Sequence, residues 1–393
     1  MRILIACDSF KGSLSSIQAA QHILTGVRRV FPGSDADTIP MADGGEGTAL
    51  ALTEALGGKL QHIRVFGPMG HPVETVFGIL PGGEAVMDMA SASGLTLVPD
   101  GQRDILAAST YGTGQLILAA LDQGCRRIYL GIGGSATNDG GLGMAQALGA
   151  RFTDSQGNSL GGENLPSRPE TFLAGKHLAE VAAMDLSALD PRLAATEISV
   201  LCDVTNPLCG PSGAAYIYGP QKGAGPAEMA LLDEGLAHLS GIVTRSIGLD
   251  NGNTPGAGAA GGLGFGLMTF TGAKLLPGIE FLLNASGFDE KAAKADLIIT
   301  GEGRLDHQSA FGKTPAGIAQ RGKALGVPVI ALGGAIEGSL DQLYRAGVAT
   351  AEAGVCAPMS LAEAMDGAGA YLEDAAERIM RAVALGMGLK EKA

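Results

Sequence analysis

Tryptophan is absent from this chain of 393 residues, and aromatic residues make up only 4% of it. Proteins that bind single-stranded nucleic acid use aromatic side chains as stacking platforms, so this scarcity argues against that class. The formal net charge of −13 likewise argues against binding to a phosphate backbone. A small anionic ligand is still compatible with the sequence, because local lysines and helix N-termini can override the overall sign.

Cysteines are few, and long apolar runs are missing. The five cysteines form no CxxC pair, which argues against a zinc ribbon or a disulfide framework, and their odd number favours a reducing cytoplasm. The N-terminal run MRILIACDSF meets Asp8 too early for a signal peptide. No stretch approaches the roughly 20 apolar residues that span a bilayer. We therefore expect a cytoplasmic protein with neither a membrane nor a nucleic acid as partner.

Several catalytic signatures are also absent. The six histidines show no HxxH or HExxH spacing, which disfavours zinc chemistry, and no GxSxG motif indicates an α/β-hydrolase. Gly256–Gly261 matches the dinucleotide fingerprint, but residues 253–255 (NTP) stand where a strand is required. Gly312–Thr314 resembles the end of a P-loop, but His307 occupies the position of the first glycine of a Walker A motif.

The chain is instead rich in glycine, with 62 residues, and 46% of it is hydrophobic. Short apolar runs alternate with amphipathic helical patterns, which is typical of an α/β fold with a largely parallel sheet. The length favours two or three domains at roughly 150 residues each. The predicted strands are 2–7, 85–90, 127–131, 198–202, 297–300 and 327–332. The predicted helices are 15–31, 47–56, 107–123, 140–148, 227–247, 315–325 and 361–385.

Polar motifs follow several of these strands. They are Asp8–Lys11 (DSFK), Gly133–Ser135 (GGS), Asp203–Asn206 (DVTN) and Gly301–Arg304 (GEGR). In open α/β sheets the ligand binds beyond the carboxyl ends of the strands. We therefore expect these segments to surround one site. The stretch 153–190, rich in Gly, Pro and Ser, is interpreted as an excursion between elements.

The segment Gly131–Gly141 (GIGGSATNDGG) follows a predicted strand and leads into a predicted helix. Its glycines allow close backbone approach, and its hydroxyl, amide and helix N-terminal groups can hold phosphate oxygens. A tight turn with a Ser or Thr cap would need fewer glycines, so we favour the anion-binding interpretation. The candidate ligand-binding residues of this loop are Gly133, Gly134, Ser135, Thr137 and Asn138.

Two other glycine-flanked loops carry carboxylates. Asp43 and Glu46 lie in ADGGEGT, and Glu302 and Asp306 lie in TGEGRLD. Mg²⁺ is commonly held by one or two protein carboxylates together with phosphate oxygens, which such loops can present. Helix capping explains Asp43 and Glu46 equally well on spacing alone.

Four cations stand in the candidate loops of this acidic protein: Lys11, Lys222, Arg304 and Lys313. A single lysine in a turn is often only solvated. Together, however, they form the kind of cationic set that a transferring phosphoryl group requires.

The motifs ACDSFKGSLS, ADGGEGT, GIGGSATNDGG, CDVTNPL, YGPQKG, PGAGAAGG and ITGEGRLDHQSAFGKTP, in this order, resemble the bacterial-type glycerate kinase family (glycerate 2-kinase, type 1) over nearly the whole chain. The resemblance implies phosphorylation of D-glycerate with ATP and Mg²⁺. It suggests attack by the 2-hydroxyl, although no residue here selects it over the 3-hydroxyl. Cys7 and Tyr218 depart from the family, where Pro and Phe are expected.

The resemblance also implies two α/β domains, with a largely parallel sheet in the Rossmann-like domain and an active-site cleft between them. We predict that residues 1–80 and 290–393 form this discontinuous Rossmann-like domain, because complementary acidic and basic groups follow separate strands in the two segments. Residues 81–289 would form an inserted α/β domain with the glycine-rich loops.

Asp203 is a candidate proton acceptor or Mg²⁺ ligand, since it should emerge at the end of the strand 198–202. Pro207 restrains the turn that follows. The alternative is an Asx-turn, in which case the proton acceptor would be Asp8, Asp43, Glu302 or Asp306.

The candidate catalytic residues are Asp203, Lys11 and Arg304. The candidate substrate- or nucleotide-binding residues are Asp8, Ser9, Asp43, Glu46, Gly133, Gly134, Ser135, Thr137, Asn138, Asn206, Lys222, Glu302, Asp306, Ser309 and Lys313. The candidate metal ligands are Asp203 and Glu302.

Two other classes of function were weighed against a kinase. An NAD(P)-dependent hydroxy-acid oxidoreductase would need a Rossmann fingerprint directly after a strand, and none is present. A non-catalytic binding protein would have little use for so many polar loops. The sequence leaves open which glycine-rich loop holds ATP and whether the chain forms a homo-oligomer.

Overall fold

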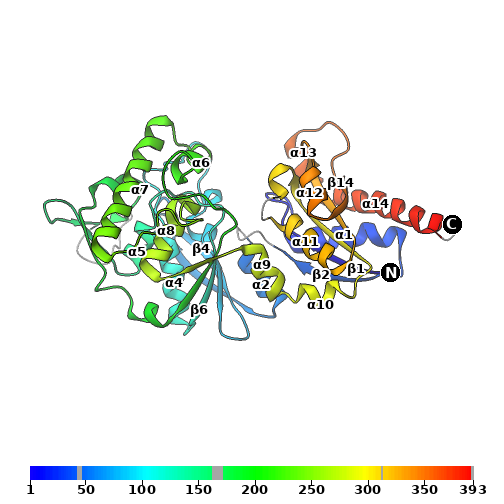
Figure 1. Ribbon diagram of the computed structural model, residues 1–393, viewed down its shortest axis with the longest axis horizontal. Helices are drawn as coiled ribbons and strands as arrows, with labels where there is room; N and C mark the ends of the chain where they lie inside the picture. Colours follow the sequence, from blue (N-terminus) through cyan, green and yellow to red (C-terminus); the bar gives the residue numbers. More distant parts are fainter. Residues whose placement is uncertain (42–46, 162–170, 311–312, 391–393) are drawn as a thin grey trace. The chain divides into compact units, whose positions relative to one another are not determined.

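The computed structural model describes residues 1–41, 47–161, 171–310 and 313–390. The chain divides into two compact units (Figure 1). Unit 1 comprises Met1–Asp43, Glu54–Leu56 and Ile279–Ala393, and unit 2 comprises Gly44–Thr53 and Gly57–Gly278. Each unit combines helices with a sheet that contains parallel strands, which confirms the predicted α/β class. None of the described helices combines the length and the apolar character that a membrane span requires.

Unit 1 is built on a five-stranded sheet in which every strand pair is parallel. The strands, in spatial order, are β14 (Val348–Ala353), β13 (Val329–Ile336), β12 (Leu297–Leu305), β1 (Arg2–Cys7) and β2 (Asp35–Pro40). The central strands begin as nearly continuous apolar runs, because a parallel sheet of this kind is covered on both faces. The N-terminal and C-terminal segments of the chain therefore share one sheet.

Helices cover both faces of this sheet (Figure 1). On one face, α1 (Ser16–Val30) and α14 (Ala368–Lys390) form a single apolar cluster with alternate residues of the strands, including Ile3 and Ile5. On the other face, α11 (Thr314–Leu325) approaches Ile298 and Val329 through its Gly322. The other α-helices described in this unit are α9 (Gly278–Ala285), which starts in unit 2, α10 (Phe288–Ala292), α12 (Asp341–Ala346) and α13 (Leu361–Asp366).

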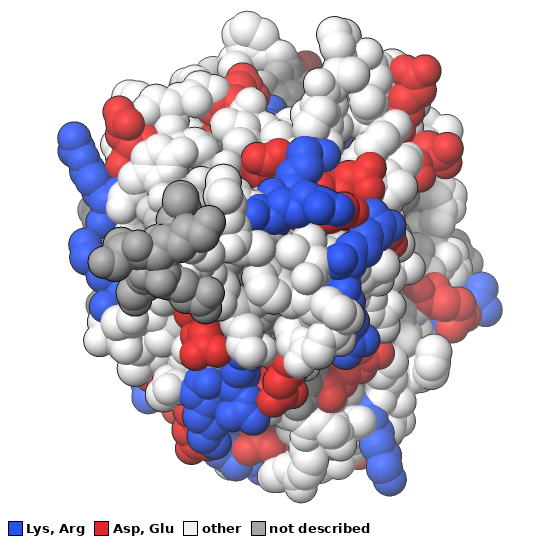
Figure 2. Space-filling model, turned by 90° about the vertical axis from the view of Figure 1, so that its right-hand side faces the viewer, with Lys and Arg blue, Asp and Glu red and all other residues white. Residues whose placement is uncertain are grey.

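Ion pairs join α1 to α14 at the edge of this cluster. Arg29 lies 2.9 Å from Asp374 and 3.3 Å from Glu377, and it also pairs with Glu373. His22 Nδ1 lies 2.7 Å from Glu373 Oε1. Acidic and basic side chains are similarly interleaved on the face that Figure 2 shows. Exposed pairs of this kind contribute little individually, so the apolar contact supplies most of the stabilisation of this helix pair.

Unit 2 contains a six-stranded mixed sheet. In spatial order its strands are β11 (Lys274–Leu276), β10 (Glu197–Leu201), β6 (Arg127–Gly131), β5 (Ala85–Asp88), β4 (Pro72–Ile79) and β3 (Lys59–Phe66). The first four are parallel, and β4 and β3 extend the sheet as an antiparallel hairpin. Its α-helices are α2 (Thr48–Ala55), α3 (Ala90–Ser93), α4 (Tyr111–Asp122), α5 (Leu142–Ala147), α6 (Ala214–Tyr218), α7 (Pro226–Ile247) and α8 (Ala259–Thr271), of which α2 ends in unit 1.

The excursion expected at 153–190 contributes to a small antiparallel sheet of β7 (Arg151–Thr153), β8 (Ser159–Leu160) and β9 (Ala183–Asp185). The division into units also differs from the expected boundaries at residues 80 and 290. The hairpin β3–β4 pairs with β5 and so lies in unit 2, and unit 1 resumes at Ile279. The half-exposed strands of the β3–β4 hairpin alternate polar and apolar residues, and such a pattern does not reveal which sheet a hairpin joins.

The close approach of α1 to α14 depends on Gly26. A Cβ atom at this position would overlap Glu373 O and lie 2.8 Å from Ala376 Cβ. We predict that Gly26→Ala destabilises unit 1 by about 1–3 kcal/mol, as overpacking of a close-packed contact does. The measurement is the urea unfolding midpoint. Gly33→Ala is the matched control, because a Cβ there meets no atom within 4 Å. Equal midpoints for the two variants would show that the helices separate at no cost.

Candidate functional site

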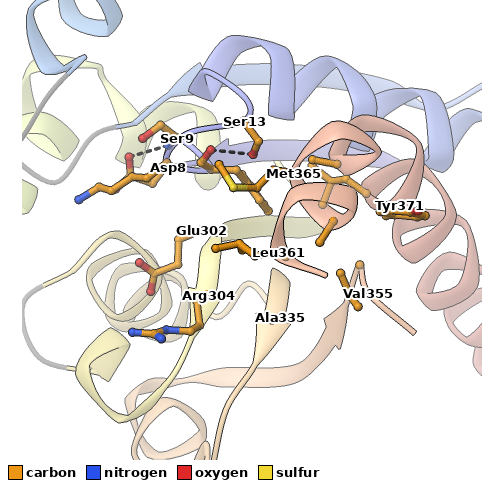
Figure 3. A pocket seen from close by; sticks show the side chains of 18 of the residues that line it. Asp8, Ser9, Ser13, Glu302, Arg304, Ala335, Val355, Leu361, Met365 and Tyr371 are labelled. Carbon is orange, nitrogen blue, oxygen red and sulfur yellow. Dashed lines mark hydrogen bonds between the residues drawn. The ribbon is translucent and has the colours of Figure 1, made fainter. Parts of the chain in front are cut away.

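A cavity of about 470 Å³ lies in unit 1 at the carboxyl ends of four parallel strands (Figure 3). Its wall includes residues that follow β1 and β14 and residues at the ends of β12 and β13. Ligands bind at this edge in open parallel sheets. The edge forms because β1 lies directly beside β12, which brings loops from opposite ends of the chain together.

One side of the cavity is polar, and sequence reasoning predicted its members. Figure 3 shows Asp8 and Ser9 from the loop after β1 on the same side of the cavity as Glu302 and Arg304 from β12. The predicted site residues that line this cavity are Asp8, Ser9, Lys11, Glu302, Arg304, Asp306 and Lys313. The structure thus brings together the described candidate residues of both terminal segments, except Ser309, which does not line the cavity.

Asp8, a buried residue of this polar wall, is held in place by hydrogen bonds. Its side chain is only 3% exposed, and its carboxylate accepts hydrogen bonds from Ser9 N at 2.6 Å and Thr314 Oγ1 at 3.2 Å. Thr314 is the first residue of α11, so the carboxylate lies at the positive end of that helix. Asp8 N donates to Gly301 O of β12. The loop after β1 is therefore anchored to both β12 and α11.

The acidic and basic groups of this wall are loosely paired. Lys313 Nζ lies 3.9 Å from Glu302 Oε2, at the outer limit for an ion pair. Arg304 lies 3.2 Å from both Asp306 and Glu337. These pairs keep the wall close to neutral and leave cationic atoms within reach of an anionic ligand.

Asp306 and Ser309 stabilise the loop after β12 by hydrogen bonds to one another. Asp306 N donates to Ser309 Oγ at 3.0 Å, and Ser309 N donates to Asp306 Oδ1 at 3.3 Å. Ser309 is fully buried. This reciprocal pair shapes the turn, and Asp306 in turn holds Arg304.

The other side of the cavity is apolar, and sequence reasoning missed it. In Figure 3 it carries Leu361 and Met365 of α13, Tyr371 of α14 and Val355 after β14. The helical pattern at 361–385 predicted one continuous helix. The structure instead breaks it at Gly367, where a Cβ would lie 2.5 Å from the Tyr371 ring. That glycine inside a helical pattern was the available signal.

Met365 reaches across to the loop after β1 because Gly12 has no side chain. A Cβ at Gly12 would overlap the Met365 methyl group, and Gly12 has a φ of +80°. Only glycine adopts this conformation without strain. The apolar and polar sides of the cavity therefore meet at Gly12.

The glycine-rich loop of unit 2 turns its side chains inward. Thr137 and Asn138 are fully buried, Ser135 is 6% exposed, and only Gly134 of the predicted residues is exposed. Gly140 N donates to Gly261 O at 3.1 Å, and a Cβ at Gly261 would overlap Thr137 O. The second glycine-rich segment thus serves close packing of one loop on another.

Lys222 fastens this loop from inside unit 2. Its Nζ donates to Ser135 Oγ and to Thr137 O, each at 2.7 Å, and its side chain is 2% exposed. Burial lowers the pKa of Lys222 to about 7, while attraction to Asp139 opposes that change. Lys222 is therefore a structural element of the loop, whichever ligand the loop meets.

Asp139 is the carboxylate that organises the same loop, and the sequence analysis did not select it. It accepts hydrogen bonds from Thr110 N at 2.8 Å and Thr110 Oγ1 at 2.7 Å. Gly141 N at 3.0 Å and Gly143 N at 3.2 Å also donate to it. Burial raises the pKa of Asp139, and these hydrogen bonds oppose the rise.

The side chains of Asp203 and Asn206 also form hydrogen bonds with other residues of unit 2. Asp203 Oδ1 accepts a hydrogen bond from Gly278 N, the first residue of α9, at 2.7 Å. Tyr218 Oη donates to Asn206 Oδ1 at 2.7 Å, and Asn206 Nδ2 donates to Ser212 O at 2.8 Å. Both residues hold the loop after β10 in place. The candidates Asp43 and Glu46 lie outside the described residues.

Comparison with known proteins decides the family. Residues 3–384 match the model of the glycerate kinase family. The chain belongs to this family. It is 48% identical over 378 residues to a glycerate kinase of Halalkalibacterium halodurans, a match that covers 96% of this chain and 97% of that protein. It is 43% identical over 388 residues to glycerate 2-kinase of Escherichia coli, with 98% and 99% covered.

A solved structure agrees with this assignment. A crystal structure from Salmonella typhimurium LT2, provisionally described as glycerate kinase 2, superposes with a TM-score of 0.83 at 41% identity. The match covers 99% of each chain. The family predicted from the order of the motifs is thereby confirmed, and the glycerate kinase fold spans both units.

The buried amine of Lys222 predicts a specific pH dependence of stability. Its pKa is lower in the folded protein than the ordinary value of 10.5, so the unfolded chain holds more protons between about pH 7 and pH 10. Raising the pH in this range therefore favours the folded state, with a limiting slope of about 1.4 kcal/mol per pH unit.

Lys222→Met removes this proton while keeping an apolar side chain of similar length. From about pH 7 to pH 8.5, the unfolding free energy of the wild type should rise relative to that of the variant, as measured by urea titrations. The other titrating groups are common to both proteins and cancel in the difference. Parallel pH profiles would mean that Lys222 titrates as an exposed lysine does.

Proposed function

We propose that this chain catalyses the ATP-dependent phosphorylation of D-glycerate on its 2-hydroxyl, which gives 2-phosphoglycerate and ADP. The observation that carries the proposal is the polar wall of the unit 1 cavity, where lysine, arginine and carboxylate groups of both terminal segments meet. Membership of the glycerate kinase family supports the reaction, and ATP is the co-substrate that a kinase of this family uses. The E. coli relative named glycerate 2-kinase supports the choice of hydroxyl.

Phosphoryl transfer needs positioning and charge stabilisation more than covalent chemistry. Lys11 and Lys313 line the cavity and can bind phosphate oxygens. Lys313 is only loosely held by Glu302, at 3.9 Å, so a phosphate can take it at little cost. Arg304 must share its guanidinium between its two carboxylate partners and a phosphate. We therefore assign the main charge stabilisation to the two lysines.

The carboxylates of this wall fit a magnesium ion that arrives with the nucleotide. Among the described residues, no group of three or more acidic, histidine or cysteine side chains forms a protein cage for a metal. Mg²⁺ prefers one or two carboxylates together with phosphate oxygens and water. Glu302, with a side chain 12% exposed on the cavity wall, is our proposed ligand. The bound ion would neutralise charge on the phosphates.

We propose a cytoplasmic location for this enzyme. All five cysteines are free thiols, and Cys7 and Cys125 are buried. Burial raises the pKa of both thiols, which protects them from oxidation. Unpaired thiols are typical of a reducing compartment.

The first test is the reaction itself. We expect the protein to release ADP from Mg-ATP in the presence of D-glycerate, and ³¹P NMR should identify the product as 2-phosphoglycerate. Lys11→Ala should lower kcat/KM about 10²–10³-fold with an unchanged circular dichroism spectrum, because a charge contact to the transferring group is lost.

Lys323→Ala is the control for that variant. Lys323 is exposed on α11 and does not line the cavity; its Nζ donates to Arg345 O at 3.3 Å. The activity of the Lys323→Ala variant should equal that of the wild type. Formation of 3-phosphoglycerate would overturn the regiochemistry, and full activity of Lys11→Ala would remove Lys11 from the machinery.

Asp203 remains our prediction for the residue that accepts the proton of the substrate hydroxyl. Asp203→Asn keeps an oxygen for the hydrogen bond from Gly278 N but deletes the charge. We predict a fall in kcat of at least about 10²-fold at nearly constant melting temperature. Asp233→Asn is the matched control in unit 2, because Asp233 Oδ1 likewise accepts a backbone hydrogen bond, from Gly210 N at 2.9 Å. Loss of activity only alongside loss of stability would leave Asp203 a purely structural cap.

A further inference from the structure

The cavity in unit 1 has two chemically different sides, and Figure 3 shows them separated. Asp8, Glu302 and Arg304 lie on one side, and Met365 and Tyr371 lie on the other. Its volume of about 470 Å³ falls in the range of pockets for ligands of drug size, roughly 300–1,000 Å³. A three-carbon acid would fill only a small part of it and would have no use for an apolar wall.

The apolar wall is built as a surface for a flat ring. Leu361 is 77% exposed, and Met365 and Tyr371 are half-buried, so these side chains expose apolar area to the cavity. Aromatic rings and methionine sulfur make favourable contacts with an aromatic ligand. The close approaches at Gly12 and Gly367 hold Met365 and Tyr371 in place, so the surface is formed before a ligand arrives.

We propose that the base and ribose of ATP bind against this apolar wall, with the phosphates extending to Lys11 and Lys313 on the polar side. The proposal rests on the proposed function for the identity of the nucleotide. The glycine-rich loop of unit 2 is the competing phosphate site, but its Ser135 is engaged by Lys222 and its Thr137 is fully buried. The unit 1 cavity therefore holds ATP, and Leu361, Met365 and Tyr371 are its nucleoside-binding residues.

The same wall offers few groups that could read the edge of the base. Among the described lining residues near it, Val355 N already donates to Gly334 O at 3.0 Å, and Gly354 N donates to Gly333 O at 2.7 Å. The Ser13 hydroxyl donates to Phe10 O at 2.8 Å. The Tyr371 hydroxyl can donate or accept, so it suits either purine. The base is thus held by shape and apolar contact, and such contacts discriminate weakly between similar ligands.

Calorimetric titration of ADP, D-glycerate and inorganic tripolyphosphate tests the assignment. Tyr371→Ala should raise the Kd for ADP roughly tenfold or more, as the loss of a stacked aromatic group does. Met365→Ala should raise it by up to about tenfold, because a sulfur–aromatic contact is lost. The Kd values for D-glycerate and tripolyphosphate should stay within about twofold. Tyr344→Ala, at an exposed tyrosine of α12 outside the cavity, should change none of the three.

Ala364→Phe is a further variant that distinguishes a lost binding site from a loss of ADP binding through unfolding. Ala364 lines the cavity and is half-buried, so the larger side chain fills the nucleoside half without removing packing. It should abolish ADP binding and retain tripolyphosphate binding. Unchanged ADP affinity in all three cavity variants would overturn the proposal, even if the wild type phosphorylates glycerate. Weakened ADP binding in a protein that fails to phosphorylate glycerate would overturn only the proposed function.

Substrate competition tests how the base is held. The wild type should use GTP with a kcat/KM within about tenfold of that for ATP, because the described wall contains no side chain dedicated to one purine edge. Discrimination of about 10³-fold or more would show that the base is read by hydrogen bonds, and this part of the proposal would be wrong.

Discussion

The parallel pairing of β1 with β12 joins Ile3 to Leu297 and Ile5 to Ile299, residues from nearly opposite ends of the chain. Asp8 directly follows β1 and Glu302 lies in the last half of β12, and the pairing brings both to one edge of the sheet. Neither segment supplies the cavity alone. The acidic, basic and apolar groups described above therefore depend on a contact whose loop-closure entropy is among the largest in the molecule.

The elements that could be predicted are those whose own sequence determines their environment. β1 and β6 are short runs that are largely apolar and buried, and their predicted bounds agree with the structure. β14 (VATAEA) is a half-exposed edge strand with no apolar run, and neither it nor the β3–β4 hairpin was expected. Whether such a strand forms depends on the neighbour to which it adds, and local sequence carries no record of that neighbour.

The candidate site divides in the same way. Its polar wall was predictable because charged residues in or directly after the carboxyl-terminal end of a buried strand must emerge at the carboxyl edge of the sheet. Tyr371 and Met365 were not predictable, since an apolar residue on a helix has the same pattern whether it faces a core or a cavity. The inward orientation of Thr137 and Asn138 depends on packing against a segment more than 100 residues later in the chain, near Gly261.

The position of β1 beside β12 also means that β1 is translated long before its neighbour in the sheet. The strands β3–β6, β10 and β11 of unit 2 have all been translated by Leu276, before β12 begins at Leu297. At about 5–20 residues per second, β1 must wait roughly 15–60 s for its central partner. During that time its apolar run is a free strand edge that invites aggregation. A nascent chain of this enzyme therefore needs its first strand shielded, by β2 and α1 or by a chaperone, until β12, in the last quarter of the chain, has left the ribosome.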